Sequence, residues 1–234
     1  MLFRQLFDST SSTYTYLVAD EGSGEALLID PVREQLERDV KLVRELGLRL
    51  VYSLDTHVHA DHVTAAGQLR ERFGVRTVAG HRGADCANLM LGQGDVLQLG
   101  SLGLQVLETP GHTDDSICFR MADRVFTGDT LLVRGCGRAD FQNGDPLALH
   151  DSITRVLFAL PDATLVYPGH DYRGMTVTTI GEEKRHNPRL AGKTRDEFVA
   201  IMNALGLPPP AKLAEALPAN RACGVPSTDP LVQG

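Results

Sequence analysis

The sequence predicts an α+β fold in which two β-sheets pack against each other and helices cover their outer faces. Short runs of β-branched and aromatic residues are separated by Gly and Asp, which is typical of antiparallel strands joined by tight turns. Other segments repeat apolar residues at helical spacing. The elements come in the order strands, helix, strand, helix, several strands, helix, strand and helices. Two sheets with helices outside bury the apolar face of each element in such a chain.

The first third of the chain predicts a hairpin and then two helices separated by a strand. Residues 13–20 are rich in β-branched and aromatic side chains, and a turn with two glycines separates them from the apolar strand 26–30. Apolar spacing predicts helices over 36–46 and 63–73, each followed by a glycine that suits a helix C-terminus. An apolar strand is expected between them at 50–54.

The middle of the chain predicts several short strands and one helix. Asp145 is expected to cap a helix with Pro146 at its first position and apolar residues over 149–160. Another strand is expected at 165–167. Short strands separated by Gly and Asp are expected around residues 77–78, 96–99, 104–107, 117–119 and 125–126.

The C-terminal part predicts helices without a clear domain boundary. We therefore expect a single domain over residues 1–234 with a short helical extension from about residue 174. Thr194 and Glu197 have the spacing of a capping box. Pro208–Pro210 should interrupt the helices, and the chain beyond about Pro218 is expected to be irregular.

The composition excludes several classes of protein. Hydrophobic residues make up 42% of the chain and charged residues 23%, as in ordinary globular domains. The net charge of -7 does not favour nucleic acid or an anionic membrane as a partner. No apolar run approaches the ~20 residues of a spanning helix, and the N-terminus has no signal or transit pattern. We expect a cytoplasmic protein.

The cysteines indicate a reducing compartment. Cys86, Cys118, Cys136 and Cys223 are far apart and form no C-x-x-C pair. Four cysteines are few for stapling a chain of this length, so we expect reduced thiols.

The most informative segment is the histidine-rich stretch 56–62, directly after an apolar strand. It contains H-x-H-x-D-H, with Asp55 just before it. His57 and His59 lie two residues apart, so in extended chain their side chains project to the same side. Imidazole and carboxylate are common metal ligands, and a solvated polar loop does not require so many of both. This pattern predicts a metal site.

Three further strand ends repeat the pattern of a small turn followed by a metal-ligand side chain. His112 and His170 each follow Pro-Gly, and Asp129 follows Thr-Gly. Glycine allows the sharp backbone turn that each of these positions requires. We expect these strand ends to converge on one edge of the two sheets.

Taken together, these residues resemble the signature of the metallo-β-lactamase superfamily. That resemblance implies an αβ/βα sandwich of two mixed β-sheets with helices on the outer faces and a metal site at one edge. The signature positions, in order along this chain, are His57, His59, Asp61, His62, His112, Asp129 and His170.

The sequence around the signature resembles one branch of that superfamily. Residues 135–141 are similar to glyoxalase II and more closely to the persulfide dioxygenases, although Ala139 stands where those enzymes usually have Thr. Residues 168–172, 187–190 and 218–225 also resemble the persulfide dioxygenases. This resemblance implies iron(II)-dependent oxidation of glutathione persulfide by O2 to sulfite and glutathione.

The resemblance also implies roles for the site residues. One Fe(II) per chain would be held by His57, His112 and Asp129, a two-histidine, one-carboxylate set that suits oxygen activation. The remaining signature residues would orient these ligands or, in a two-metal enzyme, bind a second metal: His59, Asp61, His62 and His170. The predicted substrate-binding residues are Arg138, Tyr172 and Arg189. Family analogy points to a homodimer.

Two alternatives stay open at this stage. A glyoxalase II-like hydrolase of glutathione thioesters would use two metals and all seven signature residues. A non-catalytic protein would use the metal only to hold its fold, but structural sites are usually closed by four ligands that include cysteine, and the signature has none. Cys136 and Cys223 are expected to be structural thiols, with oxidation of Cys223 by a persulfide as a further hypothesis.

Overall fold

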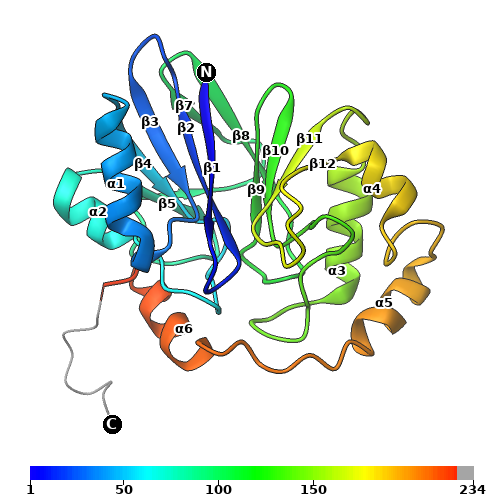
Figure 1. Ribbon diagram of the computed structural model, residues 1–234. Helices are drawn as coiled ribbons and strands as arrows, with labels where there is room; N and C mark the ends of the chain where they lie inside the picture. The colour runs from blue at the N-terminus through cyan, green and yellow to red at the C-terminus, as the bar shows by residue number, and fades with distance from the viewer. Residues whose placement is uncertain (226–234) are drawn as a thin grey trace.

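The computed structural model describes residues 1–225 and contains two six-stranded β-sheets (Figure 1). The first sheet has the strand order β1-β2-β3-β4-β5-β6, with β1 (Leu2–Asp8), β2 (Thr13–Ala19), β3 (Glu25–Ile29), β4 (Arg49–Leu54), β5 (Arg76–Gly80) and β6 (Leu89–Leu91). The second has the order β12-β11-β10-β9-β8-β7, with β7 (Val96–Leu99), β8 (Leu102–Glu108), β9 (Ile117–Arg120), β10 (Arg124–Gly128), β11 (Leu165–Pro168) and β12 (Thr178–Thr179).

Both sheets are mixed. Strands β3 to β6 are parallel neighbours and β1 to β3 antiparallel ones. In the second sheet only β10 and β11 pair in parallel. The predicted sandwich of two mixed sheets is therefore confirmed.

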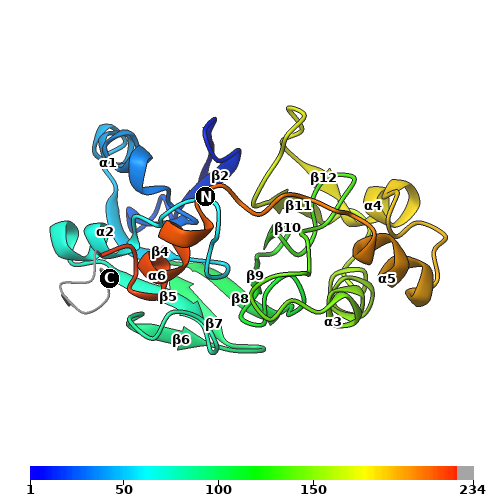
Figure 2. The ribbon, with the colours of Figure 1, turned by 90° about the horizontal axis from the view of Figure 1, so that it is seen from below.

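Helices lie outside the two sheets, as predicted. Seen from below, α1 and α2 flank the first sheet, whereas α3, α4 and α5 flank the second (Figure 2). The helical segments are a 3-10 turn (Arg33–Gln35), α1 (Leu36–Glu45), α2 (Ala66–Phe73), α3 (Pro146–Asp151) with a π-helical continuation (Ser152–Leu157), α4 (Ile180–His186), α5 (Arg195–Asn203) and α6 (Leu213–Arg221). In the described part of the chain, no helix has the length and apolar character needed to cross a bilayer.

Strand β2 shows how the sequence produces these layers. All seven of its residues are buried, because both of its faces are covered. Successive side chains of a strand point to opposite faces. Tyr16 and Val18 join the core between the sheets, whereas Leu17 and Ala19 join the apolar cluster that contains residues of α1 and α2.

The C-terminal part differs from the sequence prediction in two places. The two-residue strand β12 precedes the helices of the segment from about 174, which was predicted to be helical. The chain beyond about Pro218 was predicted to be irregular, but α6 continues to Arg221 with Pro218 inside it; residues 226–234, which the prediction also covers, lie outside the described part of the chain. The short helix persists because buried Ala216 and Asn220 hold it against the rest of the fold.

The expectation of four reduced cysteines was wrong for two of them. Cys86 and Cys223 form a disulfide, and their Cα atoms lie 5.9 Å apart. They are 137 positions apart in the sequence, so spacing gave no sign that the fold brings them together. Cys118 and Cys136 are free and buried, which for Cys136 agrees with the predicted structural thiol, whereas the same prediction was wrong for Cys223.

Replacement of a core aromatic at the junction of the sheets should strongly destabilise the fold. Phe126 is 0% exposed, and its ring centroid lies 5.0 Å from that of Tyr16 on the other sheet. Phe126→Ala should lower the free energy of unfolding of the metal-free protein by about 3–5 kcal/mol, measured by denaturant titration. The control Val96→Ala, at a position 58% exposed, should change it by less than about 0.5 kcal/mol. Equal unfolding midpoints for the two variants would contradict this assignment of the core.

Candidate metal centre

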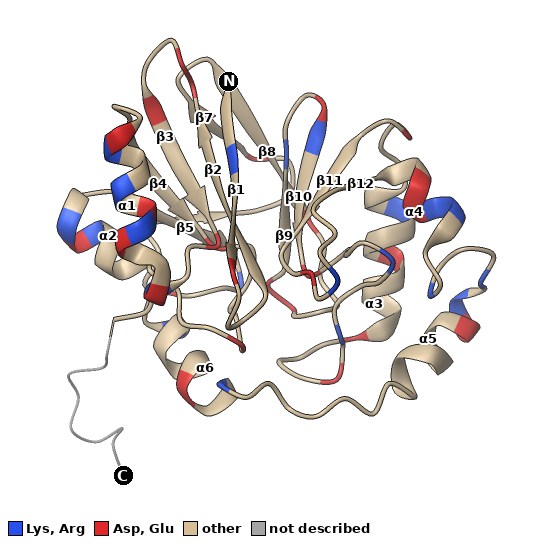
Figure 3. Cartoon of the chain, in the orientation of Figure 1, with Lys and Arg blue, Asp and Glu red and all other residues tan. Residues whose placement is uncertain are grey.

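The four strand ends singled out in the sequence meet at one edge of the sandwich. His57 follows β4 of the first sheet, whereas His112, Asp129 and His170 follow β8, β10 and β11 of the second. These strand ends lie at the lower edge of the molecule in Figure 1, and Figure 3 shows acidic residues on the loops there. The predicted convergence is confirmed.

His57, His112 and Asp129 form a compact group. One ligand atom from each lies within 4.8 Å of the others. His112 Nε2 is 3.6 Å from Asp129 Oδ2. This is the group that the sequence predicted as the metal ligands.

Hydrogen bonds fix the ring orientations of the two histidines. His112 Nδ1 donates to the carbonyl oxygen of Arg138 at 2.6 Å, which leaves Nε2 as the atom with a lone pair. Thr56 donates its hydroxyl proton to Asp30, so its oxygen is free to accept from His57 Nδ1 at 3.0 Å. Both rings therefore present Nε2 to a metal.

The charges in this group match those of a metal ligand set. Burial, reinforced by the neighbouring His59 and His112, holds the pKa of His57 well below its ordinary value, so the ring is neutral. Burial raises the pKa of Asp129, but the adjacent imidazoles, His170 first, outweigh it and hold that pKa below its usual range. A neutral imidazole and an ionised carboxylate are the forms that coordinate a cation.

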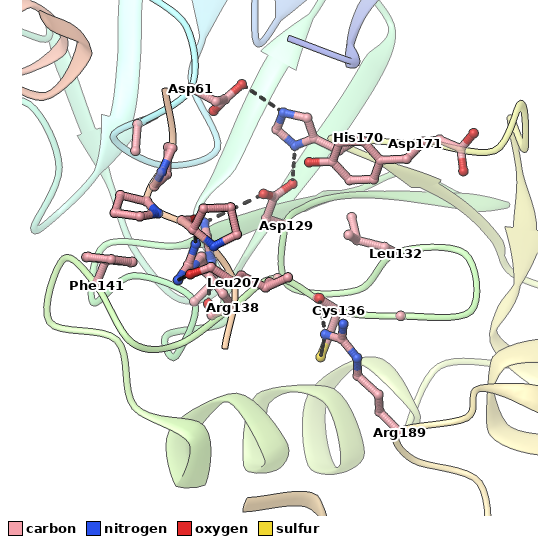
Figure 4. Close-up of a pocket in the computed structure, with 18 of the residues that line it drawn as sticks. Asp61, Asp129, Leu132, Cys136, Arg138, Phe141, His170, Asp171, Arg189 and Leu207 are labelled. Carbon is pink, nitrogen blue, oxygen red and sulfur yellow. Dashed lines mark hydrogen bonds and ion pairs between the residues drawn. The ribbon is translucent and has the colours of Figure 1, made fainter. Parts of the chain in front are cut away.

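His170 lies between two carboxylates. Its Nδ1 is 2.6 Å from Asp129 Oδ1, and its Nε2 is 2.9 Å from Asp61 Oδ2 (Figure 4). Burial lowers the pKa of His170, but the two carboxylates outweigh burial and raise it well above its ordinary value. Both ring nitrogens thus donate to carboxylates, and Asp61 Oδ2 also accepts from His62 Nδ1 at 2.9 Å.

A second group, His59, Asp61 and His62, also has three ligand atoms close together. His59 Nδ1 and His62 Nε2 are buried and have no hydrogen-bond partner among the described residues. His59 Nε2 is held by Asp30 Oδ1 at 3.1 Å. For these three residues and His170, the sequence analysis left two roles open: orienting the metal ligands or binding a second metal.

Two positioning residues were missed by the sequence analysis. Asp30 directly follows β3, has a φ of 51° and accepts hydrogen bonds from Thr56 and His59. Asn220 on α6 donates to the carbonyl oxygens of His59 and His62. Asp30 repeats the pattern of an acid after a strand and was detectable in that way, whereas Asn220 lies in a segment, 218–225, that the resemblance covered without pointing to a contact with the histidine-rich stretch.

Glycine is required where the backbone passes the ligands. A Cβ atom at position 137 would lie 2.7 Å from His112 Nδ1 and 2.5 Å from the carbonyl oxygen of Asp129. A Cβ atom at position 169 would lie 2.9 Å from Asp129 Oδ1. Gly137 and Gly169 thus permit the close packing around both ligands.

The metal group opens onto a cavity of about 650 Å³. His112, Asp129 and His170 line it together with the predicted substrate residues Arg138, Tyr172 and Arg189. Figure 4 shows Asp129 and His170 side by side, with Arg138 and Arg189 at separate places on the wall. A cavity of this size accommodates a molecule as large as a tripeptide.

The predicted substrate-binding side chains differ in how many hydrogen bonds they make within the protein and in their exposure. The Arg138 guanidinium bonds both carboxylate oxygens of Asp140 and the carbonyls of Leu207 and Pro208. Arg189 uses Nη1 to donate to the Cys136 carbonyl at 2.7 Å. Tyr172 is 73% exposed.

Comparison with known proteins agrees with the geometry. The family model of the metallo-beta-lactamase superfamily matches residues 9–85 and 88–170. Persulfide dioxygenase ETHE1 of Mus musculus is 46% identical over 96% of this chain and 89% of its own length. The crystal structure of ETHE1 from Myxococcus xanthus superposes with a TM-score of 0.95 at 63% identity, covering 96% of this chain and 100% of that one. A hydroxyacylglutathione hydrolase of Nitrobacter winogradskyi is 36% identical over 87% of this chain and 79% of its own.

Removal of the carboxylate should empty the metal group. Asp129→Ala should reduce the iron content of protein loaded with Fe(II) to below about a tenth of the wild-type value, because it deletes the one anionic member of the group. Elemental analysis of folded protein measures this content. Asp85→Ala, at an exposed position, should retain full content. Full iron occupancy in Asp129→Ala would remove Asp129 from the ligand set.

Proposed function

This chain belongs to the metallo-β-lactamase superfamily and, within it, to the persulfide dioxygenases, and we propose that it oxidises glutathione persulfide with O2 at one iron(II) ion. Sulfite and glutathione are the products. The observation that carries the proposal is the compact set of His57, His112 and Asp129, two of which, His112 and Asp129, line the cavity, in a chain so similar to ETHE1 proteins. Two imidazoles and one carboxylate suit Fe(II). When bound, the iron supplies the redox chemistry by which O2 reacts with the terminal sulfur.

The chain's own residues position the reactants. His112 and His57 are held by hydrogen bonds at Nδ1, so their Nε2 atoms keep a fixed direction. Asp129 is held by His170, which leaves its second oxygen, Oδ2, on the side of His112. A rigid set of this kind lowers the entropic cost of bringing two reactants together.

The contacts of His170 favour one metal over two. A second metal held by Asp61 and His170 requires the hydrogen bond between them, 2.9 Å long, to break. In the one-metal hypothesis that bond stays, and His170 orients Asp129. The close approach of His59, Asp61 and His62 is the observation that keeps the two-metal thioester hydrolase as the second candidate.

The cavity provides cationic groups for glutathione, which carries two carboxylates. Arg189 keeps the N–H groups of Nε and Nη2 for a ligand, since only Nη1 bonds to Cys136. The Arg138 side chain holds the carbonyls of Leu207 and Pro208, so it shapes the wall as well as supplying positive charge. Tyr172 offers an exposed hydroxyl.

Oxygen uptake with sulfite analysis tests the proposed reaction. Protein with about one iron per chain should consume O2 when glutathione persulfide is added and should form sulfite in a matching amount. The same protein should not hydrolyse a glutathione thioester. No uptake by iron-loaded protein, together with thioester hydrolysis by protein with two metals per chain, would replace the dioxygenase with the hydrolase.

Arg138→Ala separates substrate binding from metal binding. It removes the guanidinium but keeps the backbone carbonyl that holds His112, so iron content should stay at the wild-type value. Loss of a charged hydrogen-bonding group should raise KM about tenfold or more, with a smaller change in kcat. Steady-state kinetics and elemental analysis check both parts. An unchanged KM would exclude a contribution of this side chain to the binding site.

A further inference from the structure

The disulfide between Cys86 and Cys223 lies outside the cavity and has no part in the proposed reaction. Cys86 is on the loop between β5 and β6, and Cys223 lies two residues after the end of α6. Figure 2 shows α6 and the chain after it beside α2 and the first sheet. The disulfide therefore fastens the C-terminal end of the described chain to the sheet that carries His57.

The fastened segment holds the histidine-rich loop directly. The Asn220 side chain is 3% exposed and accepts from the Thr64 amide at 2.8 Å. It also donates to the carbonyls of His59 and His62, both at 2.8 Å. The carbonyl of Cys223 accepts from the amide of Gly67 at 2.7 Å. If this segment moves away, backbone groups of the histidine-rich loop, of Thr64 and of Gly67 at the start of α2 lose partners that water alone would have to replace.

The close packing leaves little room for a shifted position. A Cβ atom at Gly67 would lie 2.6 Å from the Cys223 carbonyl oxygen. A Cβ atom at Gly224, whose φ is +74°, would lie 2.0 Å from the Thr64 carbonyl oxygen. Backbone thus packs against backbone at Cys223 and at Gly224, so a displacement of this segment must change the contacts of Thr64 and Gly67.

The surroundings of the two sulfurs differ in a way that favours thiol exchange. Cys86 is half-buried, whereas Cys223 is 3% exposed, so an attacking thiolate reaches the Cys86 sulfur more easily. Arg70 Nη1 lies 4.0 Å from Cys223 Sγ and donates to the Cys86 carbonyl at 2.7 Å. Its positive charge stabilises a thiolate on Cys223, the leaving group of that attack.

We propose that the Cys86–Cys223 disulfide is a thiol–disulfide exchange site for small thiols such as glutathione, and that its opening loosens the histidine-rich loop. A glutathione thiolate attacks Cys86 Sγ, the S–S bond breaks, and Cys223 leaves as a thiolate beside Arg70. A second glutathione thiolate attacks the glutathione sulfur of the mixed disulfide and releases Cys86. In total, two glutathiones lose two electrons to form glutathione disulfide, and both cysteines take up protons.

Because small thiols open the disulfide, the mobility of the histidine-rich loop depends on the concentration of thiols around the protein. Glutathione is the product of the proposed reaction, so the reagent for opening is formed at the neighbouring cavity. That link rests on the proposed function, whereas the exchange and its effect on the loop do not. The exchange and the loosening of the loop can be measured without any assay of persulfide oxidation. Failure of the exchange proposal is therefore distinguishable from failure of the proposed function.

Thiol counting and hydrogen exchange on the native full chain test the proposal. The oxidised protein is incubated with millimolar reduced glutathione without denaturant, then alkylated in denaturant. Two alkylated cysteines are expected before incubation, because Cys118 and Cys136 are free, and four after it. The amide hydrogens of Thr64 and Gly67 should then exchange at least about tenfold faster. Amides of β8 serve as an internal control and should not change.

Variants separate the two parts of the proposal. Cys86→Ser should show the faster exchange at Thr64 and Gly67 without added thiol. Arg70→Gln should slow opening by glutathione at least about threefold, whereas Arg70→Lys should keep most of the rate, because the charge beside the leaving sulfur is retained. A disulfide that glutathione opens only in denaturant would overturn the exchange site. Opening that leaves both amides unchanged in wild type would overturn the coupling to the loop.

Discussion

The position of every candidate ligand depends on the packing of one sheet against the other, because His57 belongs to the first sheet and His112 and Asp129 to the second. Buried aromatic rings fill the junction, and among the polar contacts that cross it Tyr16 donates its hydroxyl to the Pro168 carbonyl at 2.5 Å. A buried hydroxyl must find a partner, so this bond restricts how the sheets can slide. It is made two residues before His170. The same core that stabilises the fold therefore sets the distances in the metal group.

The balance of charge is a second constraint on the edge of the two sheets where the candidate ligands meet. Buried carboxylates are costly unless each has a hydrogen-bonding or charged partner. Asp30 is paired with His59, and Asp61 and Asp129 share His170. His57 is different: burial keeps it neutral, and it contacts no carboxylate directly among the ion pairs of the described residues. The arrangement leaves one neutral imidazole, one oriented imidazole and one partly engaged carboxylate close together, a set that could hold a metal cation.

Sequence alone predicted the convergence of the strand ends because each ligand is marked locally, by a strand, a small turn and a His or Asp. It failed where the information is not local. Asn220 binds a loop 158 positions away, and Cys86 bonds to Cys223 across 137 positions. Arg138 was predicted as a substrate-binding residue, but its guanidinium is engaged by Asp140 and by the carbonyls of Leu207 and Pro208. The convergence of candidate ligands at the strand ends was therefore predictable from the sequence, whereas the contacts made by the C-terminal segment were not.

These contacts give the C-terminal segment a larger role than its length suggests. In Figure 1 the chain from α5 to α6 runs below both sheets, along the edge where the metal group lies. At one end the Arg138 side chain holds Leu207 and Pro208, while the Arg138 carbonyl holds His112. At the other end Asn220 holds the backbone of the histidine-rich loop. One short segment thus makes hydrogen bonds both to the wall of the cavity and to the ligand loop of the opposite sheet.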